Sequence, residues 1–192
     1  MTFKVITPAT AEPVSLQEAK LECKIITDIT DVAEFAEDSL IQAWIATARE
    51  VAEHYTGRAL AAQTLEMAFP AFPGDCFDLD MPPVQSVTSI KYTDLNGVEQ
   101  TVSPSLYLVS SYGTARRVAL TYGSEWPSTR DEPEAVRVRY VTGYSPAPAA
   151  VNAAIKRMVV WFNEHRGSEM DPDDIQPPSA KALLNTVKIW GF

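Results

Sequence analysis

The two histidines are the first candidates for chemistry, because an imidazole can act as an acid, a base or a metal ligand near neutral pH. His54 and His165 each follow a glutamate and lie near the C-terminal end of a predicted helix. A histidine there gains stability from the helix dipole, so a structural role is sufficient for each. A shared metal site would need both at one end of a helix pair, whereas antiparallel packing would separate them, and no third ligand has the required spacing.

Other reactive groups are also poorly placed for catalysis. Residues 171–174, Asp-Pro-Asp-Asp, resemble part of a calcium loop, but the proline and the missing glycine and glutamate spoil the match. Cys23 and Cys76 match no metal or redox spacing, and we expect both to be reduced, buried, small apolar residues. Nucleophile-elbow, phosphate-loop, zinc-protease and dinucleotide motifs are missing from the sequence. The sequence therefore predicts a protein that is not an enzyme and that has no metal and no cofactor.

The composition limits the possible partners. The 192 residues carry a net charge of -9, which argues against a dominant phosphate-binding role. A hydrophobic fraction of 46% is ordinary for a globular protein. The first ten residues lack the apolar core of a signal peptide, and no run has the length of a membrane span. We expect a protein made in the cytosol, with no membrane partner.

The longest predicted helix, residues 31–57, must position His54. Asp31 and Glu34 match a capping box, and Gly57 suits the C-terminal end. Such a helix has about seven turns and a length of roughly 40 Å. Its apolar face repeats at helical spacing and consists of Ile41, Trp44, Ile45, Ala48, Val51, Ala52 and Tyr55. Its carboxylates are interpreted as a solvated face: Glu34, Glu37, Asp38, Glu50 and Glu53.

A second helix, residues 149–166, must position His165 and supplies the simplest packing partner for the first. Val160 and Trp161 widen its apolar stripe beyond what one partner helix needs, which predicts burial on two sides. Shorter helices are expected from the capping box of Ser15 and Glu18, and from Ser179 onwards.

Between these helices the pattern changes to short alternating runs separated by turns. The Asn96-Gly97 pair between two such runs predicts a hairpin. In residues 135–141 apolar side chains alternate with Arg137 and Arg139. We predict an α+β fold, in which a helical core carries an inserted antiparallel β block. The expected divisions are residues 1–60, 61–144 and 145–192.

Arginines on the β block leave two interpretations open. Arg116 and Arg117, together with Arg137 and Arg139, form either the solvated face of strands or a contact with an acidic partner or a neighbouring subunit.

Five segments of the chain, in order, resemble tailed-phage head–tail connector proteins, also called adaptor or head-completion proteins, including those of gene transfer agents. No single segment is diagnostic, but the ordered set covers nearly the whole chain. The segments are residues 13–20 (PVSLQEAK), 48–60 (AREVAEHYTGRAL), 82–87 (PPVQSV), 122–127 (YGSEWP) and 136–144 (VRVRYVTGY).

This resemblance implies a structural protein of the virion neck that is assembled in the host cytoplasm. About twelve copies would form a ring below the portal protein, extending the DNA channel. The ring would offer a surface to the next neck or tail protein, a stopper or tail terminator. An acidic channel wall would let DNA pass without binding it. Another neck or tail module of the same particle, or an enzyme using His54 or His165, remain as alternatives.

The resemblance also suggests where contacts lie. Family members commonly dock a terminal segment onto the portal, and the C-terminal candidates here are Lys188, Ile189, Trp190 and Phe192. The two long helices would form the wall between neighbouring copies. Candidates for contact between copies are Trp44, Arg137, Arg139, Val160 and Trp161.

Overall fold

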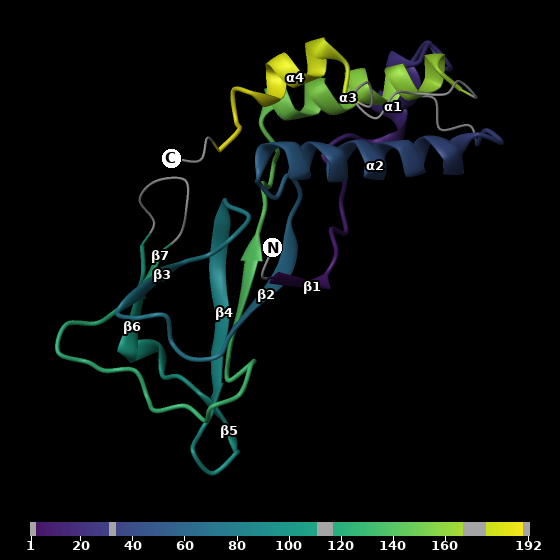
Figure 1. Ribbon diagram of the computed structural model, residues 1–192. Helices are drawn as coiled ribbons and strands as arrows, with labels where there is room; N and C mark the ends of the chain where they lie inside the picture. Colours follow the sequence, from purple (N-terminus) through teal and green to yellow (C-terminus); the bar gives the residue numbers. More distant parts are fainter. Residues whose placement is uncertain (1–2, 31–33, 111–116, 167–175, 190–192) are drawn as a thin grey trace. The chain divides into compact units, whose positions relative to one another are not determined.

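The computed structural model describes residues 3–30, 34–110, 117–166 and 176–189. The chain divides into two compact units, a β unit of residues 1–10 and 62–143 and a helical unit of residues 11–61 and 144–192. The described residues form four α-helices and two antiparallel sheets, and the predicted α+β class is confirmed (Figure 1).

The helical unit contains α1 (Leu16–Glu22), α2 (Asp38–Thr56), α3 (Ala149–Glu164) and α4 (Pro178–Leu184). The capping box predicted for α1 is present. The Glu18 amide donates to Ser15 Oγ at 3.2 Å, and the Ser15 amide donates to Glu18 Oε2 at 3.0 Å.

Helix α2 begins later than predicted. It starts at Asp38, and its 19 residues span roughly 28 Å instead of 40 Å. Glu34 lies before the helix, and Asp31 falls outside the described residues. The Asp38 carboxylate accepts hydrogen bonds from the Phe35 amide at 3.2 Å and from Lys20 Nζ at 2.7 Å, which stabilises a turn where helix was expected.

The C-terminal end of α2 is as predicted. Gly57 has φ 68°, a left-handed conformation that glycine adopts without the strain a side chain would bring, and its amide donates to the Glu53 carbonyl at 2.9 Å.

The expected packing of α2 against α3 is confirmed. The helices run antiparallel, because Arg166, just after α3, pairs with Glu37, just before α2, at 2.7 Å. Helix α3 also packs against α1 and α4, which lie with it along one side of α2 in Figure 1. These helices bury the main apolar stripe of α3, whereas Val160 and Trp161, which widen it, are only half-buried. The buried residues of α3 are Val151, Ala154, Ile155, Met158, Val159 and Phe162.

The β unit consists of two sheets. The five-stranded sheet has the order β1-β2-β8-β4-β5, and the three-stranded sheet has the order β3-β7-β6. The strands are β1 (Phe3–Thr7), β2 (Gln63–Phe69), β3 (Cys76–Asp78), β4 (Val84–Thr93), β5 (Glu99–Thr101), β6 (Tyr107–Val109), β7 (Arg117–Leu120) and β8 (Val136–Thr142).

Strand β8 lies in the centre of the five-stranded sheet and shows the predicted alternation. Val136, Val138 and Tyr140 are fully buried, whereas Arg137 and Arg139 face the other way and are partly exposed. The buried face shares one apolar core with Phe77 and Val118 of the three-stranded sheet. One face of the five-stranded sheet is thus covered by apolar packing.

Two local features complete this unit. The predicted hairpin joins β4 and β5, with the Asp94 carboxylate accepting from the amides of Asn96 and Val98. Strand β1 was not predicted from the sequence. It pairs with β2, where Lys4 is opposite Glu66.

Candidate functional site

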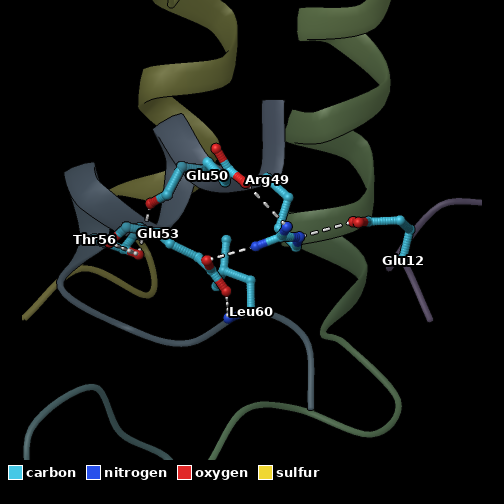
Figure 2. A network of polar contacts seen from close by, with 7 residues as sticks. Glu12, Arg49, Glu50, Glu53, Thr56 and Leu60 are labelled. Atoms are coloured by element: carbon cyan, nitrogen blue, oxygen red, sulfur yellow. Dashed lines mark hydrogen bonds and ion pairs between the residues drawn. The ribbon is translucent and has the colours of Figure 1, made fainter. Parts of the chain in front are cut away.

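A buried ion-pair network occupies the C-terminal end of α2 (Figure 2). Arg49 Nη1 lies 2.7 Å from Glu53 Oε2, and Arg49 Nε lies 2.8 Å from Glu12 Oε2. The second oxygen of Glu53 accepts the Leu60 amide at 2.8 Å. Only 8% of Arg49 and 7% of Glu53 are exposed, so the prediction that Glu53 lies on a solvated face is wrong.

Burial dominates the electrostatics of this network. It raises the pKa of Glu53, although the Leu60 amide and Arg49 favour the charged form. Burial alone would lower the pKa of Arg49. The negative charges of Glu53 and Glu12 have a larger combined effect in the other direction, so the pKa of Arg49 is raised. Both oxygens of Glu53 accept hydrogen bonds from its own chain. The network therefore fixes the segment that follows Gly57 and has the properties of a structural site.

The two histidines do not meet. His54 is exposed on α2, whereas His165 follows α3 at the opposite end of the antiparallel pair. The His165 ring stacks on Trp161 with centroids 3.7 Å apart, and its Nδ1 lies 2.9 Å from the Trp161 carbonyl oxygen. Within the described ranges, no three His, Cys, Asp or Glu side chains gather as metal ligands would. Residues 171–174 lie outside those ranges.

The two cysteines differ from each other. Cys23 is half-buried, and burial raises the pKa of its thiol. Cys76 is exposed, contrary to the prediction, because on β3 the neighbouring Phe77 takes the inward position. As for membranes, none of the helices in the described part of the chain is long and apolar enough to cross a bilayer.

The segment after α4 is held against the C-terminal end of α2. Its backbone is fixed by a hydrogen bond from the Ile189 amide to the Thr56 carbonyl at 3.0 Å. The Lys188 ammonium lies 3.9 Å from the centre of the Tyr55 ring. Two of the four docking candidates, Lys188 and Ile189, therefore contact their own chain. The other two, Trp190 and Phe192, lie outside the described residues.

Arg58 and Asn185 strengthen this attachment. Arg58 Nε donates to the Val187 carbonyl, and Tyr55 Oη donates to Asn185 Oδ1 at 2.7 Å. Val187 packs on the helical core. We call residues 185–189 the C-terminal strap.

Three of the candidates for contact between copies lie on helices and are half-buried in the helical unit: Trp44, Val160 and Trp161. Trp44 packs on the core, with the Arg166 guanidinium 4.8 Å from its ring centre. Val160 and Trp161 line a surface cavity of about 310 Å³. The Trp161 indole nitrogen is buried, and no acceptor for it exists among the residues that the structure describes.

The arginine candidates do not form one patch. Arg137 pairs with Glu99, and Arg139 pairs with Glu66 at 2.8 Å, both on the five-stranded sheet. Arg117 lies on the three-stranded sheet, where it pairs with Asp78 at 2.8 Å. Arg116 falls outside the described ranges.

Sequence reasoning missed the burial of Lys20, as it missed that of Arg49. Lys20 is only 1% exposed, with Nζ 2.7 Å from Asp38 and 4.6 Å from the centre of the Phe35 ring. The available signal was spacing, because Lys20 follows Leu16 by four residues and therefore lies on the inward face of α1. Asp38 was likewise expected on a solvated face, and it instead joins α1 to the start of α2.

No protein-family model and no curated protein match the sequence. The fold, in contrast, matches solved chains of gene transfer agent (GTA) particles. A chain from the neck of an empty GTA particle, computed with C6 symmetry, has a TM-score of 0.79 and 21% identity, covering 100% of this chain and 97% of that one. A chain from the virion of a native GTA particle has a TM-score of 0.76 and 20% identity over the same shares.

A third match is a chain from the neck of a native GTA particle, computed with C12 symmetry. Its TM-score is 0.67 at 21% identity, again over 100% of this chain and 97% of that one. At these identities the three matches establish a shared fold that extends over both the helical unit and the β unit.

Proposed function

We propose that this protein is a structural component of the neck of a tailed phage or gene transfer agent, and that it acts there as a head–tail connector. The observation that carries the proposal is the full-length fold match to chains of GTA particle necks. The ordered sequence resemblance to connector proteins supports the same assignment independently.

In this role about twelve copies form a ring below the portal protein and extend the DNA channel. The C6 and C12 symmetries belong to the matched neck structures, and they are compatible with such a ring. A net charge of -9 favours passage of DNA over binding to it, because like charges repel. The far side of the ring meets a stopper or tail terminator, and the protein carries out no reaction and needs no cofactor.

We propose a narrower C-terminal docking site than the four residues that the sequence suggested. The strap holds the Lys188 ammonium over the Tyr55 ring and the Ile189 amide on the Thr56 carbonyl, whereas the Ile189 side chain is 36% exposed. We therefore assign portal docking to Ile189 and to Trp190 and Phe192, which follow the strap. Large aromatic side chains are the residues most often found as anchors at protein interfaces.

Co-purification with the portal protein of the same particle tests this assignment. The unchanged chain should bind portal, and the double variant Trp190→Ala/Phe192→Ala should bind at least about tenfold more weakly, because two aromatic anchors are lost. Tyr122→Ala is the matched control, since Tyr122 is a fully exposed aromatic residue of the β unit.

Failure of the unchanged chain to bind portal would favour the second candidate, another neck or tail module of the same particle. Such a module would still appear in purified particles.

A further inference from the structure

The outer face of the five-stranded sheet carries four cations, which we call the basic ladder: Lys4, Lys91, Arg137 and Arg139. They lie on β1, β4 and β8, on the face opposite the buried Val136, Val138 and Tyr140. The register places Lys4, Glu66 and Arg139 in one cross-strand row, and it places Arg137 directly opposite Lys91. Strands remote in sequence thus assemble one charged surface.

This surface has more cations than carboxylates. Glu99 is shared between Lys91, at 2.7 Å, and Arg137, and Glu66 pairs with Arg139. Four cations and two carboxylates give a net charge of +2 on this face, while the whole chain carries -9. The side chains of Lys91, Arg137 and Arg139 are 38–45% exposed, so they remain accessible to a partner.

Stability alone does not explain this arrangement. Like charges directly opposite each other on neighbouring strands are destabilising, and Arg137 opposite Lys91 is such a pair, with a single carboxylate, Glu99, between the two cations. A strand face that is only exposed to solvent would be equally stable with neutral side chains, or with cations and carboxylates in alternation. An excess of cations in register is instead the pattern expected of a surface that receives carboxylates from a partner.

The helical unit of the same protein offers complementary chemistry. We call residues 28–30 and 34–40 the acidic segment, because they contain Asp28, Glu34, Glu37 and Asp38 and no Lys or Arg. Arg166 pairs with Glu37 and Lys20 pairs with Asp38, so four carboxylates and two cations leave a net charge of -2 there. The acidic segment also exposes large apolar side chains, which are uncommon in such density on a monomer surface: Ile29 at 49%, Phe35 at 37% and Leu40 at 42%.

We propose that the basic ladder of one copy binds the acidic segment of a second copy. The two surfaces differ, so the contact is head-to-tail, which is the kind of contact from which rings are built. This inference rests on the proposed function only in that a connector ring needs such a contact. DNA fits the ladder less well, because it is a much denser polyanion than the acidic segment and a chain of net charge -9 repels it.

Sedimentation at increasing protein concentration tests the contact. Wild-type protein should self-associate in low salt, and about 0.5 M NaCl should weaken this, because exposed charges are screened. The double variant Arg137→Glu/Arg139→Glu should self-associate at least about tenfold more weakly. Arg117→Glu is the control, since it changes the charge of a paired arginine on the other sheet. Thermal unfolding verifies that each variant is folded.

A charge exchange identifies the partner surface. Glu34→Lys, which reverses an exposed charge and leaves the Glu37–Arg166 pair intact, should also weaken self-association. Mixing it with the ladder variant should restore a complex, because each reversed surface then meets an opposite charge. The proposal is overturned if wild-type protein stays monomeric at about 1 mM in low salt, if the ladder variant associates normally, or if the mixture does not associate.

Binding to a DNA duplex that is lost only in the ladder variant would assign the face to nucleic acid and would also overturn the proposal. Presence of the protein in the neck of purified particles tests the proposed function separately. If the protein is found in the neck but the ladder variant associates normally, the contact proposed here is wrong and the proposed function stands. If the protein is not found in the neck, the proposed function is wrong.

Discussion

The network at the end of α2 and the basic ladder on the five-stranded sheet both consist of cations and carboxylates, but the network is buried and the ladder is exposed to solvent. Arg49 and Glu53 are almost completely buried, and their hydrogen bonds remain within the helical unit. The charges of the ladder are exposed, and only two carboxylates, Glu66 and Glu99, lie among its four cations. Buried pairs of this kind fix a fold, since each charge left without its partner would be costly. Exposed pairs contribute little stability and remain available to a partner.

The largest effect is expected in the buried network. Glu53→Gln removes the charge that compensates Arg49 and should lower the free energy of unfolding by about 3 kcal/mol. Glu50→Gln is the control, because the Glu50 carboxylate is 70% exposed and lies 3.5 Å from Arg49. Urea unfolding of the two variants measures the difference. Equal effects would mean that burial does not distinguish these two glutamates.

A smaller loss is expected at Trp44, which is half-buried. Trp44→Asp should lower the free energy of unfolding by about 2 kcal/mol, because a charge would replace an aromatic ring packed on the helical core. Val98→Asp, at an exposed position of the β4–β5 hairpin, provides the comparison. If Trp44→Asp unfolds at the same urea concentration as wild type, the ring does not contribute to the core and is free to serve a partner alone.

The loss of stability in acid should differ between a partly exposed, hydrogen-bonded carboxylate such as Glu18 and a buried one such as Glu53. The Ser15 amide and Lys156 lower the pKa of Glu18 in the folded protein, whereas burial raises the pKa of Glu53. At Glu18 the folded state therefore binds its proton less readily than the unfolded chain does. Its stabilising contribution is present above the ordinary pKa of a glutamate and is lost as the pH falls through the lowered value.

Melting temperatures measured between pH 5 and pH 3 should therefore fall less steeply in Glu18→Gln than in wild type. An unchanged slope would show that the Ser15–Glu18–Lys156 group does not contribute to acid sensitivity.

The smallest change in stability is expected on the ladder. Arg137→Gln should alter the free energy of unfolding by less than about 0.5 kcal/mol, because the pair with Glu99 is exposed and its removal also relieves the repulsion from Lys91. A loss as large as that of Glu53→Gln would indicate that the ladder is a structural element. The comparison with the buried network would then fail.

Features with local causes could be predicted from the sequence. The capping box of Ser15 and Glu18, the helix end at Gly57 and the hairpin at Asn96-Gly97 each depend on residues within a few positions of one another. The alternation of β8 was equally visible, because one face of the strand is buried in the core.

Features that depend on distant residues could not be predicted in this way. The start of α2 is set by the contact of Asp38 with Lys20, which lies on another helix. Strand β1 exists because β2, about sixty residues later, supplies its partner. Glu53 is buried because Glu12, Arg49 and Leu60 converge around it. Spacing within a single helix contains no information about such contacts.

The central claim is that this chain is a connector of the particle neck. The most direct measurement is a cryo-electron microscopy reconstruction of the neck from particles whose copy of this protein carries a small added domain. We predict extra density repeated around a ring directly below the portal, and its loss when the gene is deleted. Intact, DNA-filled particles that keep an unchanged neck without this protein would contradict the assignment.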